Sequence, residues 1–133
     1  MKLISACLLG IRCRYDSAER EIPLEIKQLI QKKECLIPVC PEQLAGLSTP
    51  RLKSSVSWNA LNYRVINENG KDLTEIFTKG AEETLKIALL TGCKKAIFKS
   101  RSPSCGEQGV TTALLRNSGI KVVVVDTYHK KQY

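Results

Sequence analysis

Short apolar segments alternate with amphipathic segments along most of this chain, and this alternation limits the fold more than any other feature. Four segments have the length and composition of buried strands: residues 2–6, 36–39, 96–99 and 120–126. Three others carry apolar residues at helical spacing: residues 22–30, 72–92 and 109–117. The alternation predicts an α/β fold, a single three-layer domain over residues 1–133 with a mostly parallel sheet.

Details within these segments sharpen the prediction. Residues 120–126 are nearly all valine, which is typical of a strand covered on both faces. The order DLTE at residues 72–75 is typical of a capping box at the start of a helix. Gly92 and Gly119 suit the left-handed backbone position that follows the end of a helix.

The segment between the second and third strands is less regular. Residues 41–59 contain several glycines, serines and prolines and are expected to form a loop. Residues 59–67 are expected to form a further strand, because Leu61, Tyr63 and Val65 alternate with polar residues.

Three of the six cysteines follow predicted strands. Cys7 and Cys40 come directly after residues 2–6 and 36–39, and Cys105 lies six residues beyond 96–99. The carboxyl ends of parallel strands meet at one edge of a sheet, which is where ligands bind in open α/β folds. We therefore expect these three thiols to converge on a metal or iron–sulfur site that leaves one coordination position open.

The remaining cysteines fit this site less well. No C-x-x-C motif occurs, which disfavours zinc ribbons, thioredoxin-type centres and clusters held by one short loop. Cys13 lies deeper in the loop after the first strand and ranks below Cys7 as a ligand. Cys35 and Cys93 are expected to be small buried apolar residues. Zinc held by three cysteines and one water remains an alternative.

Composition limits the partners. The chain is 43% hydrophobic and 26% charged, as in soluble globular proteins, and it has neither a membrane-length apolar run nor a signal peptide, so a cytoplasmic location is expected. The net charge of +8 is spread along the chain and only 5% of residues are aromatic, which favours a small anionic substrate over a polynucleotide. The only histidine, His129, lies in a polar tail at residues 128–133, so catalysis by a Cys-His pair is disfavoured.

Two candidate residues have local explanations as well. Cys105 precedes a predicted helix that begins near Gly109, and a helix N-terminus is expected to lower the pKa of a nearby thiol and to attract anions. Glu42 follows Cys40 by two residues and is either a general acid or base or the N-terminal carboxylate of a short helix at 43–47.

Taken together, the motifs resemble those of the thiouracil/thiouridine desulfidase family. The resemblance covers essentially the whole chain, and the matching motifs are SACLLG at 5–10, CRYD at 13–16, VCPE at 39–42, GKDLT at 70–74, KSRSPSCG at 99–106 and GVTTALL at 109–115. The resemblance implies a Rossmann-like domain that carries a 4Fe-4S cluster on Cys7, Cys40 and Cys105, with one iron open to the sulfur of the substrate.

The resemblance also implies roles for other residues. Glu42 and Ser102 correspond to the acid–base residues of the family. The candidates for substrate binding are Arg101, Ser104, Arg14, Asp16 and Arg51, with Lys99 a further candidate for a substrate phosphate. The implied reaction is a non-redox desulfuration of a thiolated pyrimidine, such as thiouracil or 4-thiouridine monophosphate, that releases hydrosulfide.

Two rival functions use the same sheet edge. A non-catalytic iron–sulfur or redox sensor would bind a cluster at the three cysteines without turning over thiopyrimidines. A cluster-free nucleotide-binding domain would use the strand ends as many open α/β folds do. An anaerobic absorption spectrum separates the cluster-free nucleotide-binding domain from the two functions that need a cluster. A turnover assay then separates the desulfidase from the sensor.

Overall fold

A four-stranded parallel sheet forms the centre of the molecule. The computed structural model describes residues 1–126, so His129 and the tail predicted at 128–133 lie outside the described residues. The strands are β1 (Lys2–Ser5), β2 (Leu36–Val39), β5 (Lys95–Lys99) and β6 (Lys121–Val125), in the spatial order β2-β1-β5-β6. Each neighbouring pair is parallel, so all four carboxyl ends lie at one edge.

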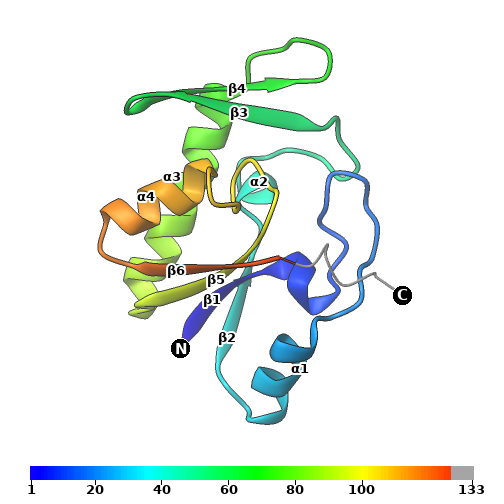
Figure 1. Ribbon diagram of the computed structural model, residues 1–133, viewed down its shortest axis with the longest axis vertical. Helices are drawn as coiled ribbons and strands as arrows, with labels where there is room; N and C mark the ends of the chain where they lie inside the picture. Colours follow the sequence, from blue (N-terminus) through cyan, green and yellow to red (C-terminus); the bar gives the residue numbers. More distant parts are fainter. Residues whose placement is uncertain (127–133) are drawn as a thin grey trace.

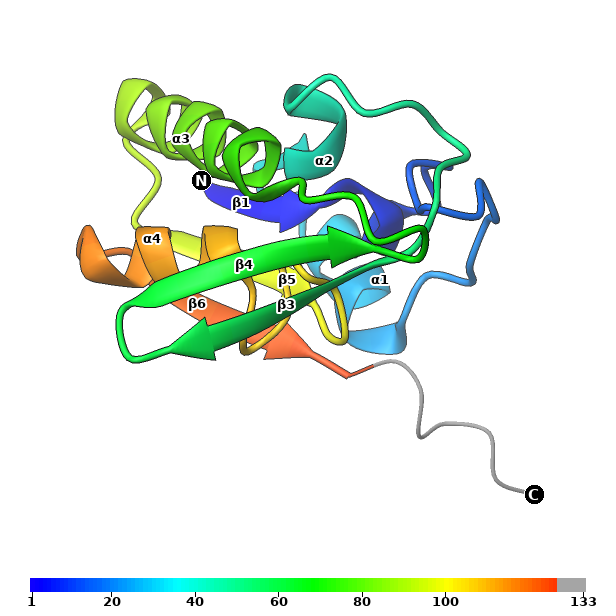
Figure 2. The same ribbon diagram turned by 90° about the horizontal axis from the view of Figure 1, so that it is seen from above.

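Helices cover both faces of this sheet (Figures 1 and 2). On one face, Ile26 of α1 (Leu24–Gln31) packs with Ile4 and Ile97. On the other face, α3 (Thr74–Thr91) and α4 (Val110–Asn117) pack against neighbouring strand residues such as Phe98. The α/β class and the parallel sheet expected from the sequence are confirmed. No helix within residues 1–126 has the length and apolar character needed to cross a membrane.

The valine-rich strand is less covered than predicted. β6 lies at the edge of the sheet, and Val123 is 38% exposed. Val123 pairs with Ile97, so it lies on the face covered by α1, which has only eight residues. One short helix does not reach across this face to the edge strand, and the prediction of burial on both faces is wrong there.

A β-hairpin replaces the end of the predicted loop and the strand expected after it. Its strands are β3 (Ser54–Asn59) and β4 (Asn62–Asn67), which are antiparallel, so the expected strand at 59–67 starts later and has a partner. Leu61 lies in the turn and is 89% exposed. Serines alternate with apolar residues in β3 because only one face of the hairpin is buried, where Val56 packs near Phe77 of α3.

Helix ends agree with the sequence better than helix starts. Gly92 and Gly119 have left-handed backbone angles, with φ of 73° and 85°. At the start of α3, however, the predicted capping box is absent: the Asp72 carboxylate accepts the Thr74 N–H at 2.9 Å, a local turn bond, and no side chain caps the helix. A second short helix, α2 (Pro41–Leu44), directly follows β2.

Candidate metal centre and active site

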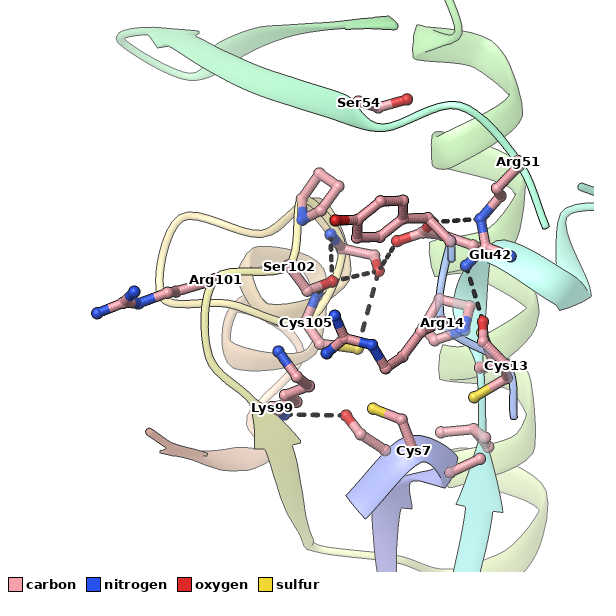
Figure 3. Close-up of a pocket in the computed structure, with 18 of the residues that line it drawn as sticks. Cys7, Cys13, Arg14, Glu42, Arg51, Ser54, Lys99, Arg101, Ser102 and Cys105 are labelled. Carbon is pink, nitrogen blue, oxygen red and sulfur yellow. Dashed lines mark hydrogen bonds and ion pairs between the residues drawn. The ribbon is translucent and has the colours of Figure 1, made fainter. Parts of the chain in front are cut away.

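The three cysteines expected to converge line one cavity at the carboxyl edge of the sheet. Cys7 lies in a 3-10 turn, Ala6–Leu9, directly after β1, and Cys40 precedes α2 at the end of β2. Cys105 comes from the loop between β5 and α4 (Figure 3). The cavity holds about 670 Å³ of free space, counting the solvent in its open mouth.

A fourth thiol, that of Cys13, lines the same cavity (Figure 3). Cys13 is only 3% exposed. In addition, the Cys40 thiol donates to the carbonyl oxygen of Cys13 at 3.7 Å. Sequence reasoning ranked this residue below Cys7, and only its proximity to Cys7 in the chain pointed to the site.

The other two cysteines lie away from this cavity. Cys93 is 3% exposed and belongs to the core, as expected. Cys35 is exposed, so the prediction that it is buried is wrong. The physical reason is its position just before β2, which is an edge strand of the sheet.

Contacts between thiols and burial raise the pKa values of Cys13, Cys40 and Cys105. Burial raises the pKa of Cys105 to about 12. The pKa of Cys40 is raised by its hydrogen bond with the Cys13 thiol and by burial. A hydrogen bond with Cys40 lowers the pKa of Cys13, but the bond with Cys7 and burial outweigh it and raise this pKa to about 11. These thiols are therefore neutral near pH 7 unless a cation stabilises their thiolates.

The expected effect of the α4 N-terminus on Cys105 is not observed. The first N–H groups of α4 are already bonded within the loop, since Val110 donates to the Pro103 carbonyl and Thr111 to the Ser104 carbonyl. The loop folds back closely enough that a Cβ at Gly109 would lie 2.3 Å from the Ser104 carbonyl oxygen. The helix end therefore offers no open anion site, and burial decides the pKa of Cys105.

Glu42 is held at the cavity by two partners. Arg51 donates from Nε to Oε1 at 2.8 Å, and Ser104 donates from Oγ to Oε2 at 3.0 Å. The Glu42 and Arg51 side chains are only 11% and 8% exposed. Glu42 also lies in the first turn of α2, as one of its two sequence-based interpretations predicted, whereas its role as general acid or base stays a prediction. The predicted helix at 43–47 begins two residues earlier, at Pro41.

Close packing against α3 holds α2 and Glu42 in place. A Cβ at Gly80 would lie 2.2 Å from the carbonyl oxygen of Pro41, so only glycine allows α3 to pass this near. Glycine in the middle of a helix costs roughly 0.5–1 kcal/mol relative to alanine. A helical glycine was thus the sequence signal for this contact, and sequence reasoning missed it.

Arg51 was predicted to bind substrate, but the structure uses its guanidinium mainly within the protein. Besides Glu42, it donates to the Ser48 carbonyl and to Thr49 Oγ1 at 3.0 Å each, and to the Cys13 carbonyl at 2.9 Å. These bonds use four of the five N–H groups of an arginine. Arg51 therefore joins α2, the 48–49 loop and the Cys13 loop.

Arg14 and Asp16 form a paired unit in which only Arg14 lines the cavity. Arg14 Nε and Nη2 donate to the two Asp16 carboxylate oxygens at 3.1 and 3.2 Å. The hydrogen bond from Arg14 lowers the pKa of Asp16 to about 2. In Figure 3 the Arg14 guanidinium extends over the cavity, so Asp16 orients a cation rather than contacting a ligand itself.

The loop after β5 supplies the remaining candidates. Ser102 Oγ accepts the N–H groups of Ser104 and Cys105 at 3.2 and 3.0 Å, and it lies 3.0 Å from Ser104 Oγ. Lys99 is only 7% exposed and donates to the Ser100 carbonyl at 3.1 Å. The Arg101 side chain is directed away from the other labelled residues in Figure 3, although the residue borders the cavity.

The donor set suits an iron–sulfur cluster. Soft thiolate ligands favour such clusters, and these cysteines come from separate segments around one cavity. Within residues 1–126, no three His, Cys, Asp or Glu side chains are grouped closely enough to hold a single metal ion. A cluster is wider than a single ion, so ligands spread around a cavity are compatible with it.

Comparisons with known proteins agree with this site. Residues 3–127 match the family model described as 2-thiouracil desulfurase. An uncharacterized protein of Bacillus subtilis (strain 168), YbbK, is 33% identical over 92% of this chain and 94% of its own length. A solved structure, that of the 4Fe-4S-dependent thiouracil desulfidase TudS, matches 92% of this chain and 88% of its own chain with 34% identity and a TM-score of 0.80. The chain belongs to the 2-thiouracil desulfurase family.

Proposed function

We propose that this protein is a cytoplasmic, iron–sulfur-dependent desulfidase of thiolated pyrimidines. The reaction converts a thiocarbonyl and one water into a carbonyl and hydrogen sulfide, which leaves as hydrosulfide, so no electrons are gained or lost. Cys7, Cys40 and Cys105 would hold a 4Fe-4S cluster whose fourth iron is open. The observation that carries the proposal is a cysteine-lined cavity with a fixed carboxylate, Glu42, at its wall.

The cluster and the protein would divide the chemistry. When bound, the cluster supplies a soft Lewis acid that withdraws electrons from the thiocarbonyl carbon. Glu42 supplies the base: each of its oxygens already accepts one hydrogen bond and keeps a further lone pair for water. From this position the carboxylate orients the attacking water and accepts its proton.

A short chain of hydroxyl groups leads away from Glu42. Ser104 donates to Glu42, and Ser102 lies 3.0 Å from Ser104. The Ser102 oxygen accepts two backbone N–H groups and Ser104 donates to Glu42, so Ser102 donates its proton to Ser104 here and would have to turn it towards a bound substrate. We assign Ser102 to donate to a ring nitrogen of the substrate and Ser104 to pass protons between Ser102 and Glu42.

Basic residues at the cavity suit an anionic substrate. Arg14 lines it with its guanidinium oriented by Asp16, and Lys99 lines it from the end of β5. Arg101 borders the cavity and a second, shallower groove beside β3. We assign Arg14, Lys99 and Arg101 to a phosphate such as that of 4-thiouridine monophosphate, and Arg51 to hold Glu42.

The test is turnover by anaerobically reconstituted protein. We expect the broad visible absorption of an iron–sulfur cluster, which cluster-free protein lacks. We also expect loss of thiocarbonyl absorbance from 2-thiouracil or 4-thiouridine monophosphate with one sulfide released per substrate. Cys93→Ala is the matched control, because Cys93 lies in the core away from the cavity. A stable cluster without turnover of either compound would favour the sensor instead.

A further inference from the structure

The cavity has one cysteine more than the proposed cluster needs. Cys7, Cys40 and Cys105 are the three assigned ligands, yet Cys13 lines the same cavity and is buried. A buried thiol in a metal cavity that does not hold the metal requires another explanation.

The position of Cys13 is well defined. Its N–H donates to the Ile11 carbonyl at 2.9 Å, and its carbonyl accepts Arg51 Nη2 at 2.9 Å. The Cys40 thiol donates to that same carbonyl at 3.7 Å. These bonds hold the Cys13 backbone against Cys40, while the Cys105 thiol lies against Ser104 at 3.8 Å.

We propose that Cys13 is a resolving thiol, which closes a reversible disulfide with Cys40 when the cluster is absent. Cys40 is the favoured partner because its thiol donates to the Cys13 carbonyl at 3.7 Å, which holds the Cys40 sulfur beside the Cys13 backbone. Cys13 also lies in a loop rather than in a helix or strand, so moving its sulfur onto that of Cys40 disrupts no regular structure at Cys13.

The chemistry balances with a small-molecule disulfide as the oxidant. The Cys40 thiolate attacks one sulfur of glutathione disulfide, which forms a mixed disulfide and releases one glutathione thiolate. The Cys13 thiolate then attacks Cys40 Sγ and releases the second glutathione. Two protein thiols lose two protons and two electrons, and one glutathione disulfide becomes two glutathione molecules. Cys40 is half-buried and Cys13 buried, so Cys40 reacts with glutathione disulfide first.

The consequence for the enzyme rests on the proposed function, whereas the disulfide itself does not. If Cys40 is a cluster ligand, the disulfide blocks cluster loading until a dithiol reduces it. It also protects both sulfurs from irreversible oxidation to sulfinic and sulfonic acids. Cluster loading would then be reversible after exposure to air.

The test uses cluster-free Cys35→Ala protein, because Cys35 is exposed and would otherwise link two molecules. Of the six cysteines this parent keeps five. After treatment with glutathione disulfide we expect the loss of two free thiols, a mass lower by two hydrogens, and a peptide pair joined through Cys13 and Cys40. A dithiol should restore all five thiols and allow cluster uptake.

Two variants of this parent act as controls. With Cys13→Ala we expect a glutathione adduct on Cys40 and no internal disulfide, whereas with Cys93→Ala the Cys13–Cys40 link should form as in the parent. Mapping the disulfide in the Cys35→Ala parent itself does not depend on how either further variant folds. A free Cys13 after full oxidation, or a link from Cys13 to Cys7 instead of Cys40, would overturn the assignment. Both of these outcomes are read from the mapped thiols and disulfides, so they do not depend on desulfidase activity.

Discussion

The two sides of the cavity differ in how far the protein alone completes them. On the carboxylate side, Glu42 is fixed by Arg51 and Ser104 with distances of 2.8 and 3.0 Å. On the thiol side, burial and contacts between thiols raise the pKa values of Cys13, Cys40 and Cys105. The acid–base side is therefore organised before any cofactor binds, while the thiol side needs a metal cation to become a set of thiolates.

The largest expected effect comes from removing a proposed ligand. Cys7→Ala, Cys40→Ala or Cys105→Ala should abolish both the reconstituted cluster and desulfuration, because three ligands are the minimum for the open-iron site. Iron and sulfide content and the absorption spectrum provide the measurement. Cys13→Ala is the matched control and should keep both properties. Loss of the cluster in Cys13→Ala would show that Cys13 is itself a ligand and would close the fourth position.

A change on the carboxylate side should separate cluster binding from catalysis. Glu42→Ala should keep the cluster and lower kcat roughly 100- to 10,000-fold, which is the usual contribution of general acid–base catalysis. The spectrum and steady-state rates of the same preparation are compared. Glu42→Gln keeps the side-chain volume and should be similarly slow. An undiminished rate in both variants would remove Glu42 as the base.

Arg51→Met tests how the carboxylate side is organised. Because the Glu42–Arg51 pair is nearly buried, removing the guanidinium should lower the free energy of unfolding by about 3 kcal/mol. Urea unfolding of the cluster-free protein measures this change. In the double variant with Glu42→Gln the loss should be smaller, since no charge is left unpaired. Equal losses of unfolding free energy in the single and double variants would contradict the assignment of Arg51 as the partner that neutralises Glu42.

Gly80→Ala tests the packing that places α2. The new Cβ would lie 2.2 Å from the Pro41 carbonyl oxygen, so α2 must shift, at an expected cost of about 2 kcal/mol of unfolding free energy. Urea unfolding is again the measurement, with exposed Lys79→Ala on the same helix as the control. Increased stability, as expected when an uncrowded helical glycine is replaced by alanine, would show that α3 does not pack closely against the Pro41 carbonyl.

The smallest effect is expected at Asp16. Its folded-state pKa of about 2 is below the ordinary value of an aspartate, near 4. The stabilisation is therefore present above about pH 4 and is lost as the pH falls towards 2. The Arg14–Asp16 pair is partly exposed, so it contributes at most about 1 kcal/mol. The stability difference between wild type and Asp16→Asn should fall between pH 4 and pH 2, and a constant difference would contradict the ion pair.

The thiol side could be predicted from the sequence more fully than the carboxylate side. Parallel topology brings strand ends together, so short apolar runs were enough to place Cys7, Cys40 and Cys105 at one edge. Cys13 could not be placed, because its loop is fixed by a bond from Arg51, 38 residues away in the chain. Loop conformation that depends on such distant partners leaves no local pattern.

Similar limits explain the errors elsewhere. The bonds that Arg51 makes within the protein could not be predicted, because the sequence shows its charge but not the four acceptors around it. The thiol of Cys105 was predicted to have a lowered pKa because a helix follows it. The carbonyl groups of its loop, however, already accept the first N–H groups of α4. The segment that forms β3 was predicted to be a loop because its many serines obscure the alternation of buried and exposed residues in a half-buried strand. In each case a tertiary contact outweighed the local signal.

The central claim is that the cysteine side activates the thiocarbonyl while Glu42 directs water at its carbon, without net redox. The most direct test is anaerobic turnover in water enriched with the heavy oxygen isotope, with no electron donor added. The account predicts one labelled oxygen in each product carbonyl and one sulfide released per substrate, at a rate that falls in Glu42→Gln while the cluster spectrum stays unchanged. A requirement for an electron donor, or a product without the label, would contradict it.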